Sequence, residues 1–155
     1  MAQVTLEEID TWNGDAQEMT DLILGIPADC LDDVVVGEWS ARQVMTHMLD
    51  SELVFSARLR TAIAEPGNPV SAFDPDAMAT RIPYQSVSIE HVGQAFLALR
   101  AGNTEILRAL PAAAWEQTID HPEHGLQMLP DVVRVFGPHI SSHMAELRAA
   151  QTRSR

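Results

Sequence analysis

The sequence contains no lysine, and all ten of its basic residues are arginines. Without a side-chain amine, the protein cannot use lysine as a Schiff-base nucleophile or as a general base. Acidic residues outnumber basic residues 22 to 10, which gives a formal net charge of −12. Because binding to phosphate backbones depends on clustered Lys and Arg, we expect no nucleic-acid partner.

Cysteine and long apolar runs are also scarce. Cys30 is the only cysteine, so no internal disulfide can form, and the neighbouring acids Asp29, Asp32 and Asp33 disfavour its thiolate. No apolar run approaches the ~20 residues of a membrane span. The first residues are acidic and lack the basic segment of a signal peptide. These features predict a soluble, cytoplasmic protein without a membrane partner and without a cysteine nucleophile.

The length of 155 residues and a hydrophobic content of 46% are typical of one globular domain. We therefore expect a single domain over residues 1–155. Its polar tail, residues 151–155, is expected to fray.

Four segments show the spacing of amphipathic helices. The first covers residues 6–24 and begins with a capping box, in which Thr5 is the N-cap and Glu8 the third helical residue. The second begins with a similar box at Ser40 and ends before Pro66, the third covers about 88–110, and the fourth begins near Pro130. Four such helices must bury their apolar faces against one another, which predicts an all-α four-helix bundle.

Two long connections separate these helices. Residues 65–87 form a proline-rich crossover between the second and third helices, and residues 112–129 form a second irregular stretch. Connections of this length are uncommon in compact domains and often line functional sites. We find no convincing pair of strands anywhere in the chain.

Three of the six histidines fall on predicted buried helix faces. His139 and His143 are four residues apart, about 40° apart around the axis and roughly 6 Å along it, so both imidazoles can reach one cation. His47 lies in the buried register of the second helix. Three imidazoles with an open coordination position are typical of a catalytic or ligand-accepting metal site. Spacing alone does not bring His47 to the other two, and hydrogen-bonded core histidines are the alternative.

Four motifs occur in an order that resembles the DinB/YfiT-like superfamily of metal-dependent enzymes. They are Glu38–Glu52 around the second helix start, Phe73–Ala77 in the long connection, His121–Gly125, and His139–Met144. The resemblance covers nearly the whole chain. It implies a four-helix bundle in which His47, His139 and His143 face one divalent metal ion, which is zinc, nickel or iron.

The resemblance also implies a function. Family members of known activity include thiol transferases that use mycothiol or bacillithiol and a mycothiol-dependent isomerase, while many members have no assigned reaction. We therefore expect a small-molecule substrate, a low-molecular-weight thiol as a second cofactor, and a homodimer. The alternatives are another reaction such as hydrolysis, a non-catalytic, stress-related bundle that binds a metal or a small ligand, and a purely structural dimer.

The sequence departs from the family pattern at three places. Ser142 occupies a position where the family often has a further histidine, and Met128 replaces the usual hydroxyl cap of the last helix. Gly137 and Pro138 directly precede His139. Because proline removes one backbone hydrogen bond, we predict a kink or a restart of the helix between Phe136 and His139, eased by the flexible Gly137.

Other polar residues are weaker candidates. Asp50 is three residues after His47 and could orient it, although exposure to solvent is an equal possibility. Arg58 lies about 20° from His47 in helical angle and roughly 16 Å along the axis, so it could hold an anionic end of the substrate or form a rim salt bridge. Glu52 lies about 140° from His47, away from the metal. A separate pair, His121 and His124, is expected to be solvated.

Overall fold

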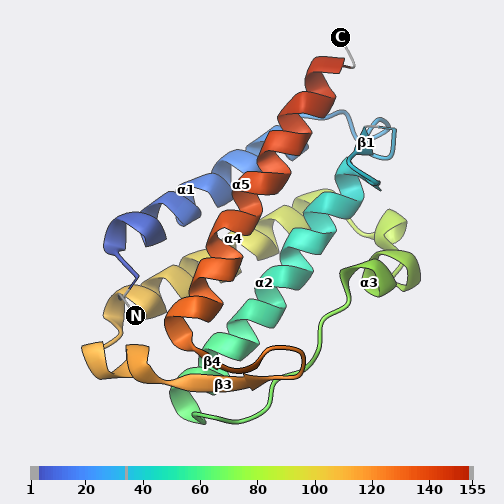
Figure 1. Ribbon diagram of the computed structural model, residues 1–155. Helices are drawn as coiled ribbons and strands as arrows, with labels where there is room; N and C mark the ends of the chain where they lie inside the picture. Colours follow the sequence, from blue (N-terminus) through green and yellow to red (C-terminus); the bar gives the residue numbers. More distant parts are fainter. Residues whose placement is uncertain (1–3, 34, 154–155) are drawn as a thin grey trace.

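The computed structural model describes residues 4–33 and 35–153, and four long helices make up most of it (Figure 1). They are α1 (Leu6–Leu24), α2 (Ala41–Ala64), α4 (Ile89–Ala109) and α5 (Leu129–Arg153). α1 and α2 each pack along both α4 and α5, so α1 lies diagonally opposite α2. The predicted all-α four-helix bundle is confirmed. None of the helices between residues 4 and 153 is long and apolar enough to cross a membrane.

The helices begin where their capping residues predict. The hydroxyl of Thr5 accepts from the N–H of Glu8, whose carboxylate accepts from the N–H of Thr5 in return. Ser40 and Gln43 form the same reciprocal pair at the start of α2. At the start of α4, Ser88 accepts from the N–H of residue 91. These local bonds satisfy backbone donors that have no partner within the helix.

The interior contains two apolar clusters with buried polar residues between them. One cluster joins the second half of α1 to the first half of α2, and the other joins the opposite halves of the same helices. Larger members of the first are Met19, Ile23, Met45, Met48, Phe96, Ile140 and Leu147, and those of the second are Ile9, Trp12, Phe55, Leu59, Trp115, Ile119 and Phe136.

An ion pair lies between these clusters. Nη2 of Arg100 is 2.6 Å from Oε2 of Glu52, and both side chains are buried. The amide of Asn103 donates to Oε1 of Glu52 and to Oγ of Ser56, both at 2.6 Å. Glu52 therefore faces the bundle interior, away from the candidate metal ligands, as its helical angle predicted.

The long crossover contains more regular structure than the sequence indicated. It includes the helix α3 (Pro75–Arg81), capped by Asp74, and the short 3-10 helix η1 (Tyr84–Ser86). Earlier in the crossover, the N–H of Val70 donates to the carbonyl of Asp120 at 3.0 Å. The crossover is thus attached to the second connection, and Figure 1 shows α3 beside α2.

The prediction that the chain contains no strand pair was wrong. β3 (Thr118–His121) and β4 (Gly125–Met128) form an antiparallel hairpin after the 3-10 helix η2 (Ala112–Glu116). β1 (Val35–Val36) and β2 (Trp39–Ser40) form a smaller one. Strands of two to four residues are too short to show an alternating apolar pattern. The turns contain Gly37 (φ +64°) and Gly125 (φ +65°), in a conformation that favours glycine.

The last helix departs from one prediction. Of the two predicted alternatives between Phe136 and His139, a kink or a restart, the restart was wrong, because α5 is one continuous helix through Pro138 (Figure 1). Buried residues on both sides of the proline, among them Phe136 and Ile140, keep one face packed across it. The helix extends to Arg153, and residues 154–155 of the tail lie outside the described part.

The start of α5 lacks the hydroxyl cap of the family pattern. Met128 is the last residue of β4, and the helix follows it directly. The first helical N–H, of Leu129, donates to the carbonyl of Gln117 at 2.9 Å. A side-chain cap often accepts from one of the free N–H groups at a helix start. Here a backbone carbonyl takes that place.

Candidate metal centre

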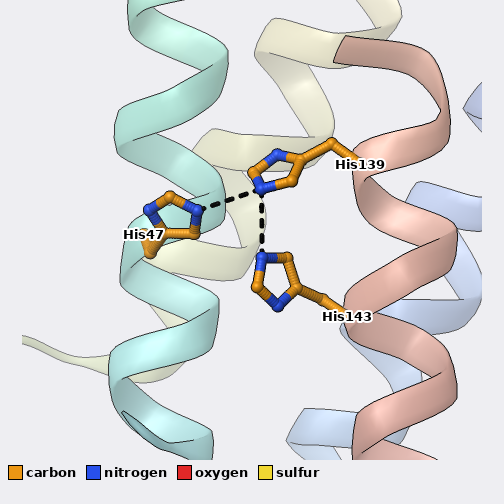
Figure 2. A group of neighbouring side chains, drawn as sticks. All are labelled: His47, His139 and His143. Atoms are coloured by element: carbon orange, nitrogen blue, oxygen red, sulfur yellow. Dashed lines mark hydrogen bonds between the residues drawn. The ribbon is translucent and has the colours of Figure 1, made fainter. Parts of the chain in front are cut away.

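Three histidines converge between α2 and α5. Figure 2 shows His47 on α2 facing His139 and His143 on α5. Nε2 of His139 lies 3.3 Å from Nε2 of His47 and 3.0 Å from Nε2 of His143. One ligand atom from each of the three residues lies within 4.8 Å of the others, a spacing that could hold a metal ion. The structure thus brings together the three residues that the sequence singled out.

Packing of the two helices explains this convergence. Val44 and Met48, on either side of His47, are buried in the same cluster as Ile140 and Met144 of α5. His139 and His143 flank Ile140, and residues four apart on a helix share one face. Because α5 is unbroken at Pro138, both histidines keep this inward orientation.

Burial keeps the imidazoles neutral. Burial, with smaller effects of His139 and His143, lowers the pKa of His47 to about 3. Burial likewise lowers the pKa of His139 to about 4 and shifts that of His143 downward. At neutral pH, all three rings are therefore unprotonated on one nitrogen, which is the form that binds metal ions.

Aromatic rings enclose the three histidines. The ring centroid of Trp39 lies 4.6 Å from that of His47 and 6.3 Å from that of His143. Phe73, from the long crossover, stacks on His47 with centroids 6.0 Å apart. The sequence analysis included both residues in family motifs but assigned neither to the site. Their place beside His47 depends on the first hairpin and on the crossover.

Two further polar groups contact the histidines. Oγ of Ser51, one helical turn after His47, lies 3.3 Å from its Nε2. Oε2 of Glu146 lies 3.3 Å from Nδ1 of His143. The other ring nitrogen of His143, Nε2, is the one that faces His139. A carboxylate in this place favours a proton on Nδ1 and a free lone pair on Nε2. The sequence analysis missed Glu146, although its position three residues after His143 could have indicated the contact.

Asp50 does not take the orienting role that the sequence allowed. Its Oδ2 accepts a short hydrogen bond from the hydroxyl of Tyr84 in η1. Burial raises the pKa of the Asp50 carboxyl. Burial and the hydrogen bond to Asp50 together raise the pKa of the Tyr84 hydroxyl. Asp50 therefore ties α2 to the crossover and is neither bonded to His47 nor fully exposed.

Arg58 and the histidines of the β3–β4 hairpin lie at a different place from the three converging histidines. Arg58 is buried rather than at a solvated rim, and its Nη2 donates to the carbonyl of Ser71 at 3.0 Å. His121 is also buried, which contradicts the prediction that it is solvated, because it packs between the hairpin and the bundle. His124 is exposed as predicted and stacks on His121.

Cys30 behaves as the sequence indicated. The charge of Asp29, with smaller effects of burial and Asp33, raises the pKa of its thiol. A raised pKa disfavours the nucleophilic thiolate. No chemical role is assigned to it.

Comparison with known proteins gives a consistent result. A 26% identical relative from Bacillus cereus (strain 03BB102), named "Putative metal-dependent hydrolase", aligns over 94% of this chain and 88% of its own length. A relative from Bacillus thuringiensis subsp. konkukian (strain 97-27) has the same name, identity and coverage. The two relatives and this chain thus match over nearly their full lengths.

A solved structure and a family model extend the comparison. The structure of YfiT from Bacillus subtilis, described as "a probable metal-dependent hydrolase with an unusual four-helix bundle topology", superposes with a TM-score of 0.83. The match covers 99% of this chain and 91% of YfiT at 19% identity, and so shows a shared fold. The family model of the DinB superfamily matches residues 12–147. This chain therefore belongs to the DinB superfamily.

Proposed function

We propose that the protein is a metal-dependent enzyme in which His47, His139 and His143 bind one divalent cation, which is zinc, nickel or iron. The observation that carries the proposal is the meeting of three neutral imidazoles at their Nε2 atoms. Imidazole is a common ligand of all three metals. Three protein ligands leave a position open for a substrate or a nucleophile.

The donor set fits a cation better than a hydrogen-bonded core. A neutral imidazole nitrogen either donates one proton or accepts with one lone pair. Nε2 of His139 faces two other Nε2 atoms, at 3.3 and 3.0 Å, so one of these contacts lacks a good hydrogen bond in any tautomer. A cation among three lone pairs removes that conflict. The conflict disfavours the alternative in which the three histidines have a purely structural role.

The reaction we favour is transfer of a low-molecular-weight thiol to a small electrophile. A divalent cation, when bound, stabilises the deprotonated form of a thiol or of water at neutral pH. The chain itself surrounds the site with Trp39 and Phe73, which limit the access of bulk water. Hydrolysis is the second candidate, because the Bacillus relatives are named for it.

Metal content tests the first part of the proposal. Purified protein should contain about one equivalent of metal per chain by mass spectrometry of the elements. His143→Ala should lose tight binding and keep its helical circular dichroism, since the apolar clusters hold the bundle. The matched control is His91→Ala, on the exposed surface of α4. Full metal content in His143→Ala would refute the assignment.

Two activity assays test the second part. Wild-type protein and His143→Ala are incubated with a low-molecular-weight thiol and 1-chloro-2,4-dinitrobenzene, and separately with 4-nitrophenyl acetate. Metal-dependent thiol consumption supports thiol transfer, and metal-dependent release of nitrophenol supports hydrolysis. Bound metal without either rate, over a wider panel of electrophiles and esters, favours the non-catalytic alternative.

A further inference from the structure

Among the residues whose side chains the structure describes, two arginines are buried, and their surroundings differ. Arg100 and Arg58 are only 5% and 8% exposed. Arg100 pairs with the carboxylate of Glu52. Within residues 4–33 and 35–153, no ion pair includes Arg58; its Nη2 donates to the carbonyl of Ser71, and its Nε has no hydrogen-bond partner.

An unpaired buried cation is unfavourable for the folded protein. Taking a guanidinium out of water costs free energy that a nearby carboxylate normally offsets. Here the compensation is weak, because the acid whose charge acts on Arg58 is Glu123, which is exposed at the hairpin turn and forms no ion pair with Arg58. An anion bound from outside the chain would therefore stabilise the buried guanidinium of Arg58.

The guanidinium lines a hollow that can admit such an anion. Arg58 shares this hollow with His121, with the exposed carboxylate of Glu123, and with the side chains of Phe73, Val132 and Phe136. The Phe136 ring lies under the guanidinium, with its centroid 5.9 Å from Cζ. The lining thus combines the buried guanidinium of Arg58 and the exposed carboxylate of Glu123 with several apolar side chains.

His121 supplies a second donor. Its Nδ1 accepts from the N–H of Glu123 at 3.2 Å, which places the proton of the neutral ring on Nε2. This tautomer also argues against a second metal site formed by His121, Glu123 and His124, although their ligand atoms lie within 4.8 Å of one another. With Nδ1 engaged and Nε2 protonated, His121 has no free lone pair for a cation.

Two aromatic residues link the hollow to the three converging histidines. Phe73, which lines it, stacks on His47. Phe136, on another wall, is three residues before His139 on α5. Along α2, Arg58 lies roughly 16 Å beyond His47, a separation that one extended small molecule can span.

We propose that Arg58, with His121, binds the carboxylate end of an extended small-molecule substrate whose apolar middle lies against Phe73 and Phe136. The other, reacting end of this substrate would lie at His47, His139 and His143. That part of the proposal rests on the proposed function. The planar donors of one arginine match the two oxygens of a carboxylate.

A binding experiment tests this site separately from the metal. Isothermal titration of the purified protein compares 3-phenylpropionate with the neutral, equally sized 3-phenylpropionamide. The wild-type protein should bind the carboxylate at least about tenfold more tightly, the effect expected for one charged hydrogen bond. Arg58→Gln should reduce this ratio to near one. Arg108→Gln removes an exposed arginine and the same charge, and should keep the wild-type ratio.

The outcomes separate the two proposals. A ratio near one in wild-type protein would overturn the carboxylate site, and this measurement needs no variant to fold. An unchanged ratio in a folded Arg58→Gln would overturn it as well. His143→Ala should keep the carboxylate preference while losing metal. If wild-type protein binds no metal but retains the preference, the metal proposal fails and the anion site stands.

Discussion

Gly137 of α5 lies directly against the indole of Trp12 in α1. A Cβ atom at Gly137 would lie only 2.1 Å from Cε2 of that ring, a distance at which real atoms overlap. The glycine is therefore required for the close approach of α1 and α5. The sequence analysis gave it another role, that of easing a distortion at Pro138, but α5 is continuous there.

Gly137→Ala should destabilise the protein by about 1–3 kcal/mol, the usual cost of forcing extra volume into a packed interior. Alanine is otherwise the better helix former, so helix propensity alone predicts the opposite sign. The matched control is Gly102→Ala in α4, where a Cβ meets nothing within 4 Å. Urea unfolding should show a lower midpoint for the first variant and an unchanged or higher midpoint for the second.

Glu52→Gln should cost roughly 3–5 kcal/mol of unfolding free energy, because it leaves the buried charge of Arg100 uncompensated. Asp10→Asn breaks an ion pair with Arg108 on the surface, where both side chains are about half exposed. That control should have a much smaller effect. Equal losses in the two variants would show that the Glu52 pair is not desolvated in solution.

The metal-free protein should lose stability as the pH falls below about 6.5. Folding lowers the pKa of His47 to about 3 and that of His139 to about 4, mainly through burial. Between these values and the ordinary pKa near 6.5, the unfolded chain binds protons that the folded chain does not, so acid favours unfolding. The loss begins near pH 6.5 and continues to the folded pKa values.

Chemical denaturation in the presence of a chelator, from pH 7.5 to 5, measures this slope. Because carboxylates also contribute in acid, the comparison is between wild-type protein and His47→Gln, which should show a shallower dependence. His91→Gln serves as the surface control. Superimposable slopes for wild-type protein and His47→Gln would contradict the burial of a neutral imidazole at this position.

We expect the protein to form a homodimer, the assembly implied by the resemblance to the family. Large apolar side chains remain exposed on α2, β4 and α5, namely Leu53 (52%), Leu126 (70%) and Val135 (62%). Burying such groups would favour association. Light scattering at micromolar concentration should give twice the 17.0 kDa mass of one chain. A mass of one chain would refute the expectation.

Much of the fold could be predicted because its signals are local. Thr5 with Glu8, and Ser40 with Gln43, form their capping bonds within three residues, so the sequence alone places the starts of α1 and α2. The inward spacing of His139 and His143 is likewise a property of one helix. The short strands, the helix α3 and the continuity of α5 at Pro138 were missed, since contacts with distant segments stabilise them.

For the site, too, some features could be predicted from local sequence and others depended on tertiary structure. The residues by themselves showed which histidines face inward, and the family resemblance paired His47 with His139. Tertiary structure decided that their Nε2 atoms meet across 92 residues of sequence, and that Trp39 and Phe73 enclose them. It also decided that Arg58 is buried and forms no ion pair with any acid of the described residues. Helix periodicity gives the direction of a side chain, whereas its neighbours depend on how separate elements pack.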